Sequence, residues 1–203
     1  MKRLNIEIKK EPFTHVILHD VYEKHEYEGV WSELLFLQKR MVPGYMTGAA
    51  GDSLGITKKR NAGIFLNDVY RNPEFSSIMV CARNTIADPH LKHIIDGIDD
   101  TYFDLYDSIN SDSTIVQSYA NGDFYKPHRD ECIFTSICCL YKKPKAFSGG
   151  LLHFPKYDFF IDLEDNQCVI FPSRIEHGVT EIKTNESNPE YNRFSISNFM
   201  KIV

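Results

Sequence analysis

The spacing of hydrophobic and polar positions changes about halfway along the chain, and the two parts predict different structures. Over residues 26–41 apolar side chains recur about every three to four positions, the pattern of an amphipathic helix packed on a core. Asn72-Pro73-Glu74 and Asp88-Pro89 each join a capping side chain to a first-turn proline, which predicts a helix start at each place. After the second start the helical period continues to Ile109 for about five turns, across Gly97.

From Ser111 onward the apolar runs are short, and turn residues such as Asn121-Gly122 and Ser148-Gly149-Gly150 interrupt them regularly. Runs this short are typical of strands and not of helices. We predict strands at 113–120, 124–130, 133–141, 150–154, 157–163, 167–172, 177–183 and 191–199. Eight short strands that follow helices predict an α+β fold, a double-stranded β-helix or cupin-like jelly-roll barrel with the N-terminal helices packed on one sheet.

The least regular stretch lies between Met41 and Asn67, where glycines recur among polar residues. Irregular stretches of this length in compact domains are usually lids or binding segments. We therefore expect residues 43–60 to close over a substrate, and the run Ala62–Leu66 to form a strand at the barrel mouth.

Length and composition fit one globular domain. The chain has 203 residues, of which 42% are hydrophobic and 25% charged, and no repeat or low-complexity linker divides it. We expect a single domain over 1–203, in which 1–110 provide helical support and the substrate loop, and 111–203 form the jelly roll.

Net charge and cysteine content limit the kinds of partner and the cellular compartment that we expect. The net charge of −5 predicts no nucleic-acid partner, because proteins that track phosphates carry a basic face. No apolar run is long enough for a signal peptide or a membrane span, so no membrane partner is expected. The five cysteines form no CxxC pair and are odd in number, which favours the reducing cytoplasm over a disulfide framework. The oligomeric state stays open.

His128-Arg129-Asp130 is the only His-x-Asp or His-x-Glu triplet in the chain. Residues two apart on a strand point to the same face, so this histidine and aspartate can contact one metal ion. His177 follows a run that reads as a buried strand ending in a turn. Two imidazoles and one carboxylate are the ligand set that holds non-haem Fe(II) and leaves positions open for substrate and oxygen. The pattern therefore predicts an iron-dependent oxygenase.

Arg193 and Ser195 share one face of the last predicted strand. A guanidinium group pairs with a carboxylate through two parallel hydrogen bonds, and a hydroxyl adds a further donor. This pair is a candidate anchor for the distal carboxylate of a co-substrate.

Four elements, in this order, resemble the prolyl-4-hydroxylase-like branch of the Fe(II)/2-oxoglutarate dioxygenase superfamily. They are Tyr119-x-x-Gly122-x-x-Tyr125-x-x-His128-x-Asp130, Ser148-Gly149-Gly150-Leu151 with Phe154, Phe171-Pro172-Ser173-x-x-x-His177-x-Val179, and Arg193-x-Ser195. The resemblance covers residues 113–199. It implies a 2-oxoglutarate-dependent hydroxylase that uses Fe(II) and O2, with ascorbate as a candidate reductant.

The resemblance also implies which side chains hold the cofactors and the substrate. The iron ligands would be His128, Asp130 and His177, the 2-oxoglutarate contacts Arg193, Ser195 and Tyr119, and the residue overlooking the iron Tyr125. Cys139 departs from the pattern, because some relatives carry a tyrosine there that also holds the co-substrate carboxylate. Arg60 and Asn61, in the poorly matched first half, are further candidates for substrate binding.

The resemblance points to a prolyl or other amino-acid residue of a peptide or protein as substrate. A free amino acid or another small metabolite is the alternative, because the same barrel serves many substrates. A non-enzymatic cupin-like metal-binding or sensing protein would need no carboxylate anchor, so Arg193-x-Ser195 argues against it. A nucleic-acid dealkylase is disfavoured by the acidic net charge.

Overall fold

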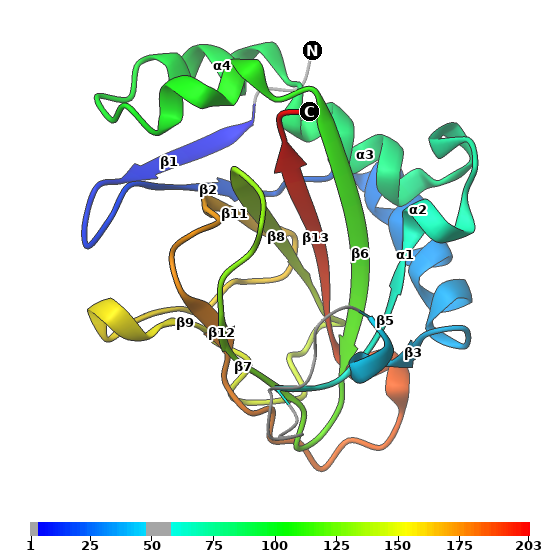
Figure 1. Cartoon of the computed structure of the whole chain (residues 1–203). Helices are drawn as coiled ribbons and strands as arrows, with labels where there is room; N and C mark the ends of the chain where they lie inside the picture. Colours follow the sequence, from blue (N-terminus) through cyan, green and yellow to red (C-terminus); the bar gives the residue numbers. More distant parts are fainter. Residues whose placement is uncertain (1–3, 48–57) are drawn as a thin grey trace.

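The computed structural model describes residues 4–47 and 58–203, in which two antiparallel sheets form the centre of the molecule (Figure 1). Among these residues the larger sheet has the strand order β1-β2-β11-β8-β13-β6-β5-β3, and the smaller has the order β10-β9-β12-β7-β4. In the larger sheet the strands are β1 (Asn5–Lys9), β2 (His15–His19), β11 (Gln167–Pro172), β8 (Phe134–Leu140), β13 (Arg193–Lys201), β6 (Ser111–Tyr119), β5 (Ala62–Phe65) and β3 (Val42–Pro43). In the smaller sheet they are β10 (Phe159–Ile161), β9 (Leu152–Phe154), β12 (His177–Val179), β7 (Phe124–His128) and β4 (Lys59–Arg60).

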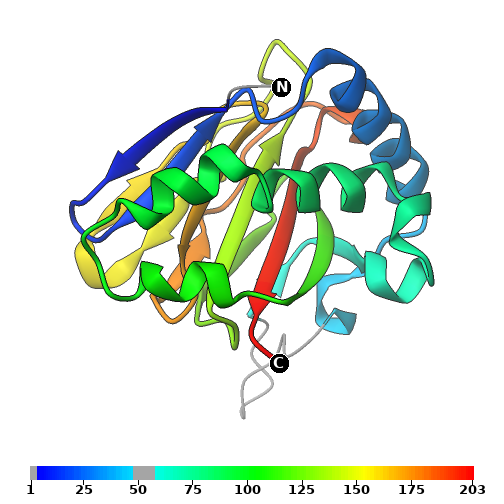
Figure 2. The same cartoon turned by 90° about the horizontal axis from the view of Figure 1, so that it is seen from above.

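Helices cover the outer face of the larger sheet, and Figure 2 shows them lying across its strands. The α-helices are α1 (Lys24–Gln38), α2 (Leu66–Val69), α3 (Ser77–Ile86) and α4 (Pro89–Asp96). Short 3-10 helices occur at Gly44–Met46, Pro73–Phe75, Phe103–Ser108, Pro155–Tyr157 and Pro189–Tyr191. The apolar side chains of the helices and of the larger sheet form the largest core cluster.

Alternation along β13 gives the larger sheet two different faces. Phe194, Ile196 and Met200 point toward the helices and belong to the core between the helices and the larger sheet. Each buried side chain of this kind stabilises the fold by ~1.5–3 kcal/mol. Because successive side chains on a strand point to opposite faces, Arg193 and Ser195 point inward and line a cavity between the sheets. The same periodicity thus builds the core and places polar groups in the interior.

The predicted α+β class and all eight strands of the second half are confirmed, although five of the strands (β7, β8, β9, β10 and β12) are shorter than predicted and the two sheets do not close into a barrel. The first predicted helix is present as α1, and Asp88 caps α4 by accepting hydrogen bonds from the backbone of His90 and Leu91. The strand predicted at the barrel mouth is present as β5.

Two helix predictions were wrong in their limits. The chain makes only a 3-10 turn at Pro73–Phe75, and α3 begins at Ser77 because the Ser76 hydroxyl accepts a hydrogen bond from the Met79 backbone. The helix predicted to run to Ile109 ends at Asp96, with Gly97 as its C-cap residue. Glycine lowers helix stability and favours termination at such a position.

The first half contributes more than helical support. Strands β1 and β2 pair with each other and β2 pairs with β11, while β5 pairs with β6. Residues 48–57, most of the segment expected to close over a substrate, lie outside the described residues. Within the described part of the chain, no helix has the length and apolar character needed to cross a membrane.

Candidate active site

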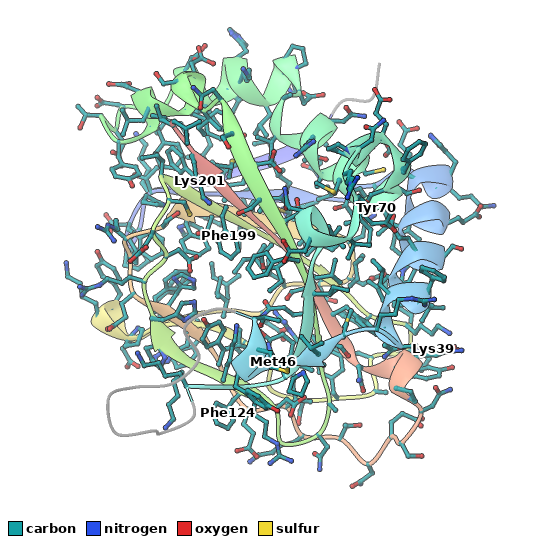
Figure 3. The ribbon with its side chains drawn as sticks, turned by 45° about the vertical axis from the view of Figure 1, so that its right-hand side comes forward. Lys39, Met46, Tyr70, Phe124, Phe199 and Lys201 are labelled. Atoms are coloured by element: carbon teal, nitrogen blue, oxygen red, sulfur yellow. The ribbon has the colours of Figure 1, made fainter. Side chains whose placement is uncertain are left out.

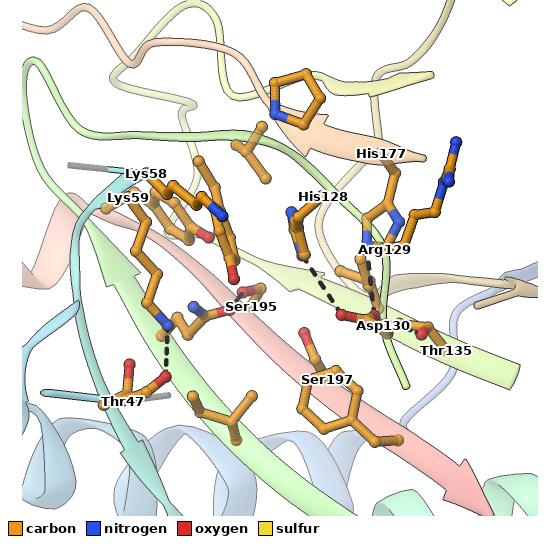
Figure 4. A pocket seen from close by; sticks show the side chains of 18 of the residues that line it. Thr47, Lys58, Lys59, His128, Arg129, Asp130, Thr135, His177, Ser195 and Ser197 are labelled. Carbon is orange, nitrogen blue, oxygen red and sulfur yellow. Dashed lines mark hydrogen bonds and ion pairs between the residues drawn. The ribbon is translucent and has the colours of Figure 1, made fainter. Parts of the chain in front are cut away.

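Strands β7 and β12 lie side by side in the smaller sheet and bring the two predicted histidine ligands together. Their register pairs His128 directly with His177. Asp130 follows β7, and its Oδ1 and Oδ2 atoms lie 3.4 Å from the Nε2 atoms of His128 and His177, respectively (Figure 4). One ligand atom from each of the three residues falls within 4.8 Å of the others.

Hydrogen bonds on the far side of each imidazole fix which nitrogen faces the carboxylate. The Nδ1 atom of His128 lies 3.1 Å from the Lys126 carbonyl oxygen, and that of His177 lies 2.9 Å from the Ile175 carbonyl oxygen. A carbonyl oxygen only accepts, so each Nδ1 carries a proton. Each Nε2 faces Asp130, to which it donates when the ring is protonated, and it offers a lone pair to a metal ion when the ring is neutral. This arrangement is the usual one for histidines that bind metals.

Aromatic rings hold the two imidazoles in place. The ring of Tyr125 stacks on that of His128 with centroids 3.7 Å apart and planes 13° apart. Phe171 meets the ring of His177 edge-on at 4.8 Å. His177 is almost fully buried, with 3% of its side chain exposed, so its orientation is set by packing.

Asp130 is held by a hydroxyl group from the larger sheet. Thr135 on β8 donates to Asp130 Oδ2 at 2.6 Å, and the Thr135 and Ser173 hydroxyls lie 2.9 Å apart. Burial acts to raise the pKa of the Asp130 carboxyl, but its contacts with His128 and His177 outweigh burial and hold that pKa well below its usual range. The carboxylate is therefore ionised at neutral pH, as a metal ligand must be.

These observations fit a divalent metal ion. Two imidazole nitrogens with free lone pairs and one ionised carboxylate converge from one side, and the cavity occupies the other side. Such a facial set of three leaves further coordination positions open, as non-haem Fe(II) requires.

Arg193 lies in the same cavity, on β13. Its side chain is almost fully buried, with 2% exposed, and its Nη1 atom has no hydrogen-bond partner within the described residues. The guanidinium carbon lies 5.3 Å from the centroid of the Tyr119 ring. An unpaired buried cation is unfavourable, so this group suits an anionic ligand such as a carboxylate.

Ser195 and Tyr119 lie beside the guanidinium. Ser195 lines the cavity and donates to Gln117 Oε1 at 3.5 Å. Burial raises the pKa of the Tyr119 phenol, and the charge of Arg193 opposes that shift without reversing it. The Tyr119 hydroxyl therefore keeps its proton and can donate a hydrogen bond. Cys139 is buried and pairs with Ser195 in the sheet.

Gly150 makes room for Arg193. Its φ of +70° lies in the left-handed region, and a Cβ there would lie 2.6 Å from Arg193 Cδ and 2.4 Å from Ile182 Cδ1. The glycine of the Ser148-Gly149-Gly150 turn is therefore required by both backbone conformation and space.

Gly150→Ala is expected to lower the free energy of unfolding by at least ~1–2 kcal/mol, the cost of a left-handed conformation for a residue with a Cβ. It should also displace Arg193 and weaken binding of a carboxylate ligand there. Thermal unfolding and ligand titration test both effects. Gly29→Ala is the matched control, because its Cβ would meet nothing closer than 3.5 Å and alanine favours a helix. Wild-type stability and affinity in Gly150→Ala would contradict this role.

The two candidates from the first half lie in different environments. Asn61 is buried near Tyr119, and neither polar atom of its side chain has a hydrogen-bond partner within the described residues. Arg60 is exposed, and its Nε lies 3.5 Å from Asp123 Oδ1. The structure therefore brings Asn61 close to the Arg193 end of the site and leaves Arg60 outside the cavity.

The cavity between the sheets has a volume of about 590 Å³ and is lined by residues of both sheets, including all three metal-ligand candidates and Arg193. Phe199, labelled in Figure 3, contributes to its apolar wall from β13. The volume is in the range of small-molecule binding sites. Tyr125 also lines it, next to His128.

Sequence reasoning did not assign Thr135 or Lys59 to the site, although both line this cavity. The sequence could have predicted the position of Thr135, because this residue follows the apolar Phe134 on a predicted strand and therefore points to the opposite face, toward the cavity. Lys59 belonged to a run of three basic residues that resembles an ordinary solvated loop, and only its pairing with β7 places it inside.

Residues 114–201 match the family model described as the 2OG-Fe(II) oxygenase superfamily. No curated protein matches the chain in sequence. A prolyl-4-hydroxylase from Pseudomonas putida is similar in structure, with a TM-score of 0.61 at 15% identity over 93% of this chain and 92% of that one.

Two further solved structures are similar. The viral collagen prolyl hydroxylase of Paramecium Bursaria Chlorella virus-1, solved with 2OG, has a TM-score of 0.55 at 11% identity over 93% of this chain and 96% of that one. The alpha-ketoglutarate-dependent epimerase SnoN of nogalamycin biosynthesis has a TM-score of 0.53 at 12% identity over 92% of this chain and 76% of that one. At these identities the likeness shows the fold, and it confirms the predicted double-stranded β-helix.

Proposed function

Because residues 114–201 match the family model of the 2OG-Fe(II) oxygenase superfamily, we propose that the chain hydroxylates an unactivated C–H bond of a prolyl or other amino-acid residue in a peptide or protein. This match, together with the cluster of His128, Asp130 and His177, confirms the predictions of an oxygenase and of Fe(II) and 2-oxoglutarate as its cofactor and co-substrate. It also favours an enzyme over the non-enzymatic metal-binding alternative.

The observation that carries the proposal is the convergence of His128, Asp130 and His177 in one cavity with an unpaired arginine nitrogen. In this proposal the three residues hold Fe(II). Arg193 binds the C5 carboxylate of 2-oxoglutarate, and Ser195 and Tyr119 donate further hydrogen bonds to it. Bound Fe(II) supplies the oxygen chemistry that oxidises 2-oxoglutarate to succinate and carbon dioxide and inserts oxygen into the substrate.

The protein's own contribution is to hold these groups in a fixed geometry and to limit access of water. The ligand histidines are oriented by backbone carbonyls, and Asp130 by Thr135. Tyr125, which lines the cavity beside His128, contacts the substrate in this proposal. Such orientation by neighbouring groups commonly determines metal affinity and activity.

Two similar folds belong to prolyl hydroxylases, which supports an amino-acid residue as substrate. The similar fold of an epimerase of nogalamycin biosynthesis supports the alternative, a small metabolite, which includes a free amino acid. The net charge of −5 disfavours a nucleic-acid substrate.

We also propose one domain over 1–203, because β2 and β5 of the first half pair with β11 and β6 of the second. None of the five cysteines forms a disulfide, and all five are buried. That state is compatible with the reducing cytoplasm as the protein's location.

A succinate-release assay tests the proposed function. Purified enzyme with Fe(II), 2-oxoglutarate and ascorbate should release succinate faster with a peptide, a protein or a free amino acid from a broad panel, and mass spectrometry should find that substrate heavier by one oxygen atom. Prolyl peptides are expected among the active substrates. Stimulation only by methylated nucleic acids, with loss of the methyl group, would contradict the proposal.

A further inference from the structure

Lys59 is a second buried cation in the cavity. It lies on β4, which pairs with β7 so that Lys59 is opposite Tyr125. Only 3% of Lys59 is exposed, whereas its neighbour Arg60 points outward to solvent. The two-residue strand β4 therefore turns one basic side chain inward and one outward.

The Lys59 ammonium group has donors to spare. Its Nζ donates to the Thr47 carbonyl oxygen at 2.6 Å and lies 5.1 Å from the centroid of the Tyr125 ring (Figure 4). No carboxylate within the described residues lies within 4.0 Å of it. An ammonium group can donate three hydrogen bonds, so the others are available to a ligand in the cavity.

Burial lowers the pKa of Lys59 to about 8, and the charge of Asp130 opposes that shift. At neutral pH most molecules therefore still carry the ammonium charge. A buried charge is unfavourable unless it is paired, and the described residues provide only a carbonyl oxygen and an aromatic face.

The other charges of the proposed centre cancel one another. Fe(II) contributes two positive charges and Arg193 one, while 2-oxoglutarate contributes two negative charges and Asp130 one. The remaining charged residues that line the cavity are two basic and two acidic side chains, none of them buried: Lys58, Arg129, Glu131 and Glu176. Lys59 is thus the one buried charge left over in this part of the chain.

We propose that Lys59 binds a carboxylate group of the primary substrate and so selects substrates that carry one. This inference rests on the proposed function, because it assigns Arg193 to 2-oxoglutarate and leaves Lys59 for the molecule that is oxidised. A carboxylate fits better than a phosphate, because a single ammonium balances its single charge, whereas a phosphate monoester carries ~1.5–2 negative charges.

The carboxylate has three possible sources: a free amino acid, the C-terminus of a peptide, and an acidic side chain next to the oxidised residue. Each source can be tested with a pair of probes that differ only in charge. The pairs are L-proline and L-prolinamide, a prolyl tripeptide acid and its amide, and a blocked peptide with glutamate or glutamine beside proline.

The experiment measures calorimetric affinity for these pairs with wild-type enzyme loaded with 2-oxoglutarate and Mn(II) in place of iron, so that no turnover occurs. At least one acid is expected to bind on the order of 10- to 100-fold more tightly than its neutral partner, the range for a hydrogen bond between charged groups. In Lys59→Met this preference should vanish, while the affinity for 2-oxoglutarate stays unchanged.

Two controls separate a binding role from a structural one. Lys126→Met removes the charge of an exposed lysine on the neighbouring strand β7 and should leave the preference intact. Lys59→Met should unfold at no lower temperature than wild type, because methionine fills a similar volume without a buried charge.

The proposal is overturned if wild-type enzyme shows no preference for any acid, whether it binds both partners or neither, or if the preference survives in Lys59→Met. It is also overturned if Lys59→Met loses affinity for 2-oxoglutarate, which would place Lys59 in the co-substrate site. Succinate release driven equally by neutral amides would remove the role of Lys59 and leave the proposed function standing. Failure of 2-oxoglutarate itself to bind would count against both.

Discussion

Asp130→Ala is expected to reduce 2-oxoglutarate-dependent turnover to background. The substitution leaves only His128 and His177 as protein donors, and it also leaves the Thr135 hydroxyl without its acceptor. Loss of an outer-shell partner typically costs 10- to 100-fold in metal affinity or activity, so loss of a direct ligand should cost at least that much. Succinate release and Fe(II) binding by equilibrium dialysis measure the two effects.

The fold should survive this substitution, because Asp130 lies after β7 on the cavity wall and contributes nothing to the apolar core. Far-ultraviolet circular dichroism checks that point. Glu131→Ala is the matched control, since Glu131 is an exposed carboxylate next to Asp130 that also lines the cavity. It should retain metal binding and turnover. Full iron-dependent activity in Asp130→Ala would show that the ligand assignment is wrong.

Arg193→Ala is expected to raise the apparent KM for 2-oxoglutarate on the order of 10- to 150-fold. The lost interaction is a hydrogen bond to a charged group, worth ~1.5–3 kcal/mol, and 1.4 kcal/mol corresponds to about tenfold in affinity. The buried guanidinium with its unpaired Nη1 is the reason for expecting the upper part of that range. Steady-state kinetics with varied 2-oxoglutarate gives the result.

Arg193→Lys separates charge from geometry. Lysine keeps the positive charge but lacks the planar fork that matches a carboxylate, so its KM should fall between those of wild type and Arg193→Ala. The metal affinity measured without 2-oxoglutarate should stay unchanged in both variants. An unchanged 2-oxoglutarate dependence in Arg193→Ala would place the carboxylate anchor elsewhere.

The predictions from sequence succeeded where a pattern is local. Strand alternation predicted β13 with Arg193 and Ser195 on one face, and the His-x-Asp triplet predicted two candidate ligands that lie two positions apart on the chain. His177 was found because a recognisable buried strand precedes it. In each case residues close in sequence carry the information.

The predictions failed where distant pairing decides the outcome. Whether Lys59 or Arg60 faces the cavity depends on the register between β4 and β7, some 65 residues apart along the chain, and nothing local in a run of basic residues reveals it. The helix after Asp88 was predicted too long because its apolar period continues past Gly97, where the backbone nevertheless ends the helix. β1 was missed although Ile6 and Ile8 alternate with polar residues as on a strand.

The most direct test of the Fe(II) and 2-oxoglutarate centre is a calorimetric titration of 2-oxoglutarate into the protein with and without a divalent metal, under anaerobic conditions. If the three ligands and Arg193 act on one molecule, one 2-oxoglutarate should bind per chain, and its affinity should depend on both the metal and Asp130. Binding that is equally tight without metal, or in Asp130→Ala, would contradict a shared centre.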